Sequence, residues 1–125
     1  MSEQFPNQDL DLSLLNEIAD GSDEFIVESI TMFLEQTPEL LKQVSDLIAQ
    51  KDWLNAGLTA HKMKANLGFF GMLDTQELIQ QVERACKAGG ENPYSIIVKF
   101  NQAKATIAVN MVTLAKLRDE MRAGL

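Results

Sequence analysis

The 125-residue chain is poor in the residues that build covalent cross-links and metal centres: it has one cysteine and one histidine. A single cysteine cannot form an internal disulfide, and one histidine with one cysteine cannot complete a structural zinc site. We therefore expect no metal and, because paired cysteines are absent, a cytoplasmic and reducing compartment. A Ser-His-Asp hydrolase needs only one histidine, so that class is excluded only weakly.

Basic residues are also scarce, with 11 Lys and Arg against 18 Asp and Glu and a formal net charge of −7. Such a chain is a poor ligand for a phosphate backbone, so we expect neither nucleic acid nor an anionic membrane as a partner. The first eight residues are polar and lack the order of a signal peptide. No apolar run is long enough to span a bilayer.

The sequence does contain enough apolar residues, 46%, for one domain with a core. No segment shows the period-two alternation of strands, whereas apolar residues recur at helical spacing throughout. Because the connections between long helices are short, we predict an all-α fold, an antiparallel four-helix bundle with short accessory N-terminal helices. We expect residues 1–10 to be a flexible leader and residues 11–125 to form the bundle domain.

The helix boundaries follow from residues that favour helix ends. Ser, Thr, Asp and Asn accept hydrogen bonds from free amides of the first turn, and proline suits the first helical position. A side chain three residues further on can complete a reciprocal capping box. These rules predict a helix over 11–19 and further helices that start at Ser22, at Thr37-Pro38, at Asp52, at the capping box Asp74–Glu77 and at Asn92-Pro93, the last reaching Met121.

The helix after Asp52 carries the only histidine, His61. At about 100° per residue, its apolar residues form one core-facing stripe, and His61 lies roughly 140° from the centre of that stripe. This stripe consists of Trp53, Ala56, Ala60, Met63, Leu67 and Phe70. His61 should therefore face away from the core, where an imidazole nitrogen can act as a nucleophile.

Small and basic residues share the face of His61. Gly57, Lys64 and Gly68 stand at −4, +3 and +7 from it. Lys64 can neutralise an anion on the ring. We expect the glycines to let another protein approach closely, although tight packing between helices would also favour them. Between Asp52 and Asp74 there is no acidic residue, so Lys62 and Lys64 form a basic island in an acidic chain, and Lys62 would add to docking.

This segment resembles the signature of the histidine-containing phosphotransfer (Hpt) domain: a His, a Lys three residues later, a small residue after it, and Gly at +7 and +10. Here these are His61, Lys64, Ala65, Gly68 and Gly71. The resemblance implies a helical bundle that works in a phosphorelay. Its histidine takes a phosphoryl group from a receiver-domain aspartate and passes it to a second receiver.

The same resemblance assigns roles to the residues. His61 would be the phosphoacceptor and Lys64 the charge partner, while Gly57, Lys62, Ala65 and Gly68 would contact the partner. The partners would be receiver domains of a hybrid sensor histidine kinase and of response regulators. The protein would be a phosphocarrier rather than an enzyme, without a cofactor, because the receiver supplies the magnesium.

On the next helix, many family members carry a Gln that orients the imidazole or the phosphate. Glu83 falls near that position and Gln80 one turn earlier. A carboxylate there would repel phosphate but could accept a ring N–H, so neither residue is assigned a role.

Several alternatives stay open at this point. The protein could be a helical adaptor that works without phosphorylation, or a hydrolase with His61 as its base, although no positioned nucleophile accompanies it. It could also be the detached end of a hybrid kinase. Leu54, Leu58 and Ala65 would form either a docking collar or a packing face. We expect a monomer, although the long last helix could also pair with another copy.

Overall fold

The computed structural model describes residues 5 and 7–125, which form five α-helices and no β-strand. The helices are α1 (Ser13–Ala19), α2 (Asp23–Ala49), α3 (Trp53–Phe69), α4 (Leu73–Lys87) and α5 (Pro93–Ala123). The prediction of an all-α fold is therefore confirmed. In this described part no helix is long and apolar enough to cross a membrane.

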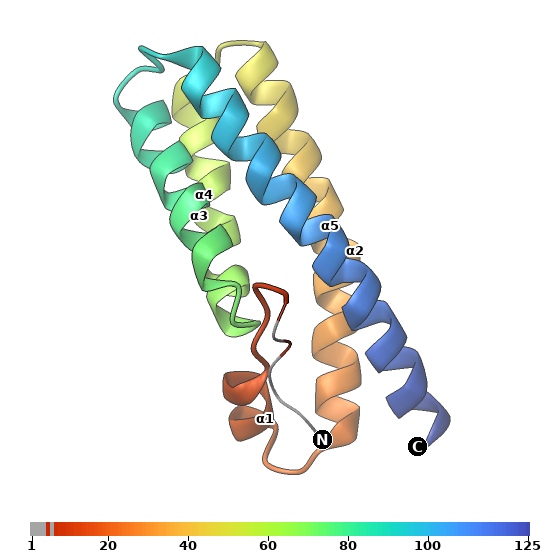
Figure 1. Ribbon diagram of the computed structural model, residues 1–125. Coiled ribbons are helices and arrows are strands. Elements are labelled where there is room, and N and C mark those ends of the chain that lie inside the picture. The colour runs from red at the N-terminus through yellow and green to blue at the C-terminus, as the bar shows by residue number, and fades with distance from the viewer. Residues whose placement is uncertain (1–4, 6) are drawn as a thin grey trace.

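Helices α2 to α5 lie side by side as a bundle (Figure 1). Helix α2 contacts α3 and α5, and α4 contacts the same two neighbours, so each helix buries its apolar stripe between two others. The fully buried side chains come from all four helices and include Ile30, Val44, Met63, Leu67, Ile79, Val82, Ile96, Ile107 and Leu114. The strongest helix pair is α3 with α4, which carries the site described below.

Three predicted caps are present. The Ser22 hydroxyl accepts from the Phe25 amide at 3.1 Å, Asp52 from the Asn55 amide at 3.3 Å, and Asn92 from the Ser95 amide at 3.2 Å. Each of these bonds joins residues three apart in sequence, so the sequence alone is sufficient to predict it.

The predicted helix start at Thr37-Pro38 is wrong, because α2 runs through both residues without a break. Proline in a helix interior removes one backbone hydrogen bond and costs about 3 kcal/mol. Here Pro38 is exposed, whereas Phe33, Thr37 and Leu41 are buried on the inner side of the helix. The continuous buried face that packs against α3 and α5 outweighs the local preference for a break.

The predicted capping box at Asp74 is also wrong. Helix α4 begins at Leu73, and no side chain of its own caps it. Instead the Asp9 carboxylate accepts from the Asp74 amide at 3.1 Å and from the Thr75 amide at 2.7 Å. A carboxylate 65 residues away therefore occupies the positive end of the α4 dipole.

The structure describes residues 5 and 7–10 of the expected flexible leader, and residues 8–10 contact the bundle. Residues 1–4 and 6 lie outside the described residues. Leu10 is buried, and the Asp9 carbonyl accepts from the side-chain amide of buried Asn110 at 2.8 Å. The Gln8 side chain donates to Asn110 at 3.3 Å and to Thr113 at 2.8 Å. This stretch therefore binds the ends of α3 and α4 and the middle of α5.

Helix α5 packs along α2 to its end. Leu114 is fully buried, Met121 packs against the core, and the Arg122 guanidinium donates to the Thr31 hydroxyl at 3.3 Å. Figure 1 shows the two helices continuing together past α3 and α4. One face of the last turns of α5 thus packs against α2 within one chain.

Candidate functional site

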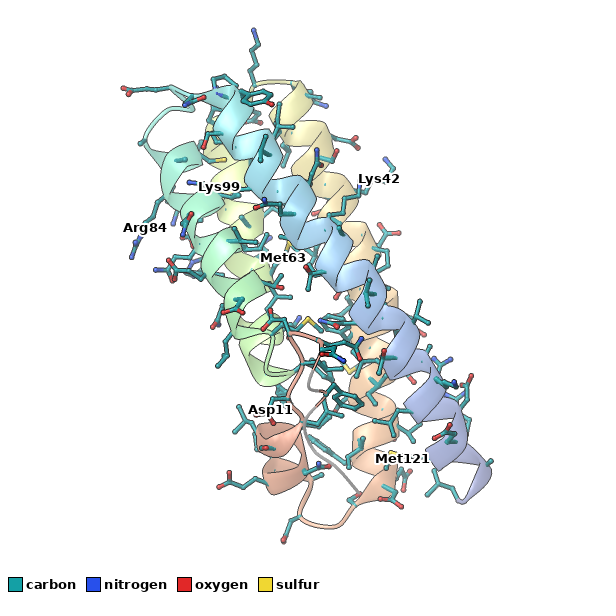
Figure 2. The ribbon with its side chains drawn as sticks, viewed as in Figure 1. Asp11, Lys42, Met63, Arg84, Lys99 and Met121 are labelled. Carbon is teal, nitrogen blue, oxygen red and sulfur yellow. The ribbon has the colours of Figure 1, made fainter. Side chains whose placement is uncertain are left out.

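Helix α3 presents His61 at the edge of the bundle. Its inner face is buried through Ala56, Ala60, Met63 and Leu67. Figure 2 shows Met63 in the interior between the helices. His61 follows Ala60 by one residue, and its side chain is 62% exposed. The ring is therefore accessible to another molecule, as the helical rotation predicts.

One nitrogen of the ring is held by α4. His61 Nδ1 lies 2.9 Å from Oε2 of Glu83, whose side chain is only 7% exposed. The two residues are 22 apart in sequence and meet because α3 and α4 pack closely. The hydrogen bond fixes the plane of the imidazole and points its other nitrogen, Nε2, away from Glu83.

Two lysines complete this group, which we call the His61 cluster: His61, Lys64, Glu83 and Lys87. Lys87 Nζ lies 2.6 Å from Glu83 Oε2, and Lys64 Nζ lies 2.7 Å from Oε1. The Lys87 contact is a well-directed hydrogen bond. Lys64 and Glu83 Oε1 form an ion pair by distance. Among the described residues, Oε1 has no hydrogen-bond partner.

The cluster keeps Glu83 ionised. Burial by itself would raise the pKa of Glu83, but the ammonium groups of Lys64 and Lys87 and the ring N–H of His61 outweigh it and lower the pKa to about 2. An ionised carboxylate can only accept hydrogen bonds. His61 Nδ1 must therefore donate its proton, and in the neutral ring Nε2 then carries a free lone pair.

The glycines of α3 serve the packing against α4. A Cβ on Gly57 would lie 3.1 Å from Lys87 Cγ, and one on Gly68 would lie 2.6 Å from Gln76 Nε2. The side-chain amide of Gln76 donates to the backbone carbonyl of Lys64 at 2.9 Å. The prediction that these glycines leave room for a partner protein is corrected here, because α4 occupies that space.

The remaining predicted site residues stay outside the cluster. Lys62 and Ala65 are exposed on α3, next to His61 in sequence. Leu54 and Leu58 are exposed as well. No neighbouring helix covers them among the described residues, so they do not form a packing face within the chain. An apolar and basic surface therefore borders the imidazole.

A model of the Hpt domain family matches residues 28–123, which is most of the chain and includes the whole His61 cluster. The chain belongs to the Hpt domain family. Hpt domains carry phosphoryl groups in two-component signalling and interact with receiver domains. Searches of curated proteins and of solved structures returned no match.

The match to the Hpt domain begins inside α2, so the N-terminal segment and α1 precede it. These elements are nevertheless integral to the bundle. Asp9 caps α4, and the Asp11 amide donates to the Phe70 carbonyl at 3.2 Å at the end of α3. The two helices that carry the His61 cluster, α3 and α4, are thus anchored by residues outside the matched region.

The sequence places Glu83 near the position of the family's Gln, as a possible acceptor for a ring N–H, without assigning it a role, and it gives no indication of Lys87. One signal was available for Glu83: it stands four residues after Ile79, on the buried side of α4, where an ionised group needs partners. Lys87 stands one turn further, at the spacing of a helical ion pair. Which residue of α3 would meet them depends on how the two helices pack.

The thiol of Cys86 is buried. Burial raises the pKa of the Cys86 thiol to about 11, so it stays protonated at neutral pH. In the described part of this Hpt domain, no group of three His, Cys, Asp or Glu side chains could hold a metal ion.

Proposed function

We propose that the protein is a phosphorelay intermediate that accepts a phosphoryl group on His61 Nε2 and passes it on. The donor would be the aspartyl-phosphate of a receiver domain in a hybrid sensor kinase, and the acceptor the receiver of a response regulator. One observation carries the proposal: the exposed ring has Nδ1 held by an ionised, buried carboxylate, which leaves Nε2 as the free nucleophile. The antiparallel four-helix bundle would serve as its rigid support.

The chemistry needs one bond to form and one to break. The Nε2 lone pair attacks phosphorus, and the bond from phosphorus to the aspartate oxygen breaks, with its electron pair left on the receiver's carboxylate. The ring becomes cationic as the new bond forms. Because Glu83 accepts the Nδ1–H, it stabilises that charge and lets the proton remain on Nδ1.

The surface around His61 fits a receiver as partner. Leu54, Leu58 and Ala65 offer apolar contact, and Lys62 offers a positive charge to an acidic phosphorylation site. Magnesium would remain with the receiver. We also propose that the protein acts as a monomer, since the inner face of the last turns of α5 packs against α2 within one chain. A cytoplasmic location stays a prediction.

The test is phosphoryl transfer from a phosphorylated receiver, with magnesium, to the purified protein. Label on this chain should be acid-labile and base-stable, and it belongs to His61 because the chain has no other histidine. His61→Gln should abolish labelling, by at least about 1,000-fold, since no other side chain offers an imidazole nitrogen.

A matched control returns a histidine to the chain at a position outside the His61 cluster. His61→Gln combined with Gln102→His places an exposed imidazole on α5 and should remain unlabelled. Transfer to that double variant would contradict the role of the cluster. If His61→Gln keeps every partner interaction and the native chain takes no label from several receivers, the protein is a phosphorylation-independent adaptor instead.

A further inference from the structure

The His61 cluster holds a negative charge next to a ring that is proposed to carry a dianionic group. Glu83 Oε2 accepts from Nδ1 at 2.9 Å, on the same imidazole whose Nε2 would bear the phosphoryl group. A buried carboxylate at this position repels that group unless its charge is offset. The negative charge of Glu83 therefore has to be offset by cations that are bound to its carboxylate.

Lys64 and Lys87 divide this task between the two carboxylate oxygens. Lys64, from α3, faces Oε1, whereas Lys87, from α4, binds Oε2, the oxygen that also holds the imidazole. With a neutral imidazole, the carboxylate and two ammonium groups leave the cluster with one net positive charge. Without Lys87, the oxygen nearest the ring would have no cationic partner.

The packing of the helices makes room for Lys87. Gly57 is buried, and a Cβ added to it would lie 3.1 Å from Lys87 Cγ. The aliphatic stem of Lys87 therefore lies directly against α3, and this route brings Nζ to the carboxylate. Arg84 provides the contrast on the same helix: it extends outward from α4 (Figure 2), whereas Lys87, although also exposed, reaches Glu83.

We propose that Lys87 is a positioning residue for phosphotransfer, which offsets the charge of Glu83 at the oxygen that holds His61 and so allows a phosphoryl group to reside on Nε2. The inference rests on the proposed function. In this role Lys87 acts through Glu83 and has no need to touch the phosphoryl group.

The test is a double-mutant cycle of Lys87→Gln and Glu83→Gln, with Arg84→Gln as the control that removes the same charge from the same helix. Each protein is equilibrated with a phosphorylated receiver and magnesium, and the labelled fraction is measured. The labelled chain is then separated from the receiver, and the half-life of its phosphohistidine is followed. Thermal unfolding of each variant is recorded alongside.

Lys87→Gln alone should lower the equilibrium constant for phosphate on His61 about tenfold, a size typical of one lost charge-assisted contact. It should shorten the phosphohistidine half-life as well. In the Glu83→Gln background the same substitution should cost less than about threefold, because a neutral amide needs no counter-charge. Arg84→Gln should stay within about twofold of the native chain.

Three results would overturn the proposal. Lys87→Gln could match the native chain, or it could cost tenfold in both backgrounds, which would show that Lys87 acts on the phosphate directly. It could also lower the melting temperature in proportion to the lost phosphate, which would show a structural role. If the native chain takes no phosphate at all, the proposed function fails before the role of Lys87 is reached.

Discussion

Two polar clusters connect distant parts of the chain, and they differ in whether they are closed. The first, around Asp9 and Asn110, ties the N-terminal segment to α4 and α5 through hydrogen bonds to backbone and amide groups. The second is the His61 cluster. Its carboxylate is buried, as Asn110 of the first cluster is, but its imidazole is 62% exposed.

The difference shows how one small bundle separates stability from chemistry. In the closed cluster each named donor meets an acceptor inside the protein, so the hydrogen bonds hold the fold together. In the open cluster each oxygen of the buried carboxylate faces an ammonium group, while Nε2 of His61 is left to solvent. Changes in the first cluster should therefore reduce stability, and changes in the second should reduce transfer.

The largest effect on stability is expected at Gly71, beside the closed cluster. Gly71 has φ +68°, and a Cβ there would collide with the backbone of Asp11. Gly71→Ala should lower the free energy of unfolding by about 3 kcal/mol or more, since neither backbone can move freely. Denaturant unfolding followed by circular dichroism measures it, and transfer to the remaining folded protein should be normal.

Gly21 supplies the control for Gly71. It also has a positive φ, +87°, but a Cβ there would meet nothing within 4 Å. Gly21→Ala should cost only the backbone strain, about 1 kcal/mol. Equal losses in the two variants would show that the contact with Asp11 contributes nothing.

A middle-sized effect is expected in acid, at the open cluster. Because the pKa of Glu83 is lowered from 4.5 to about 2, its contribution to stability is fully present above pH 4.5 and is lost as the pH falls through about 2. The pKa difference corresponds to at most about 3 kcal/mol, and we expect between about 1 and 3.

Comparison with Glu83→Gln isolates this contribution, because the variant has no carboxyl group to protonate. The unfolding free energies of the two proteins should differ most at neutral pH and converge as the pH falls from 4.5 through about 2. A difference that stays constant from pH 7 to pH 2 would contradict the ionised state of Glu83. The other carboxylates titrate in both proteins and cancel in the comparison.

The smallest effect on stability is expected for Gly57→Ala. Alanine in place of glycine favours a helix by about 1 kcal/mol, and the close contact with Lys87 Cγ offsets most of it. The net change should stay within about 0.5 kcal/mol. Since the stem of Lys87 must move, labelling of His61 should fall by a few fold. A clear rise in stability with normal labelling would show that the space above Gly57 is open.

The features that could be predicted from the sequence are those decided within one or two helical turns. The caps at Ser22, Asp52 and Asn92 bind amides three residues away. The outward direction of His61 follows from its rotation relative to Ala60 and Met63 on one helix. Neither result requires knowledge of a neighbouring element.

The features that could not be predicted involve partners from elsewhere in the chain. Thr37-Pro38 has the local form of a helix start, but the packing of α2 against two helices keeps it continuous. Asp74 has the form of a cap, but α4 begins one residue before it, and Asp9 accepts from the Asp74 and Thr75 amides. In both cases the local preference is worth little compared with the burial or hydrogen bonding that tertiary contacts supply.

The sequence by itself determined that the protein is all-helical and that its single histidine is exposed, with Lys64 one turn away. Only the tertiary structure decided what lies behind that histidine. Glu83 and Lys87 come from a different helix, and the contact surface between α3 and α4, with Gly57 and Gly68 at its closest points, sets their distance to His61. Helical periodicity fixes the direction of a side chain, but only packing brings two helices close enough for a buried carboxylate to hold the ring.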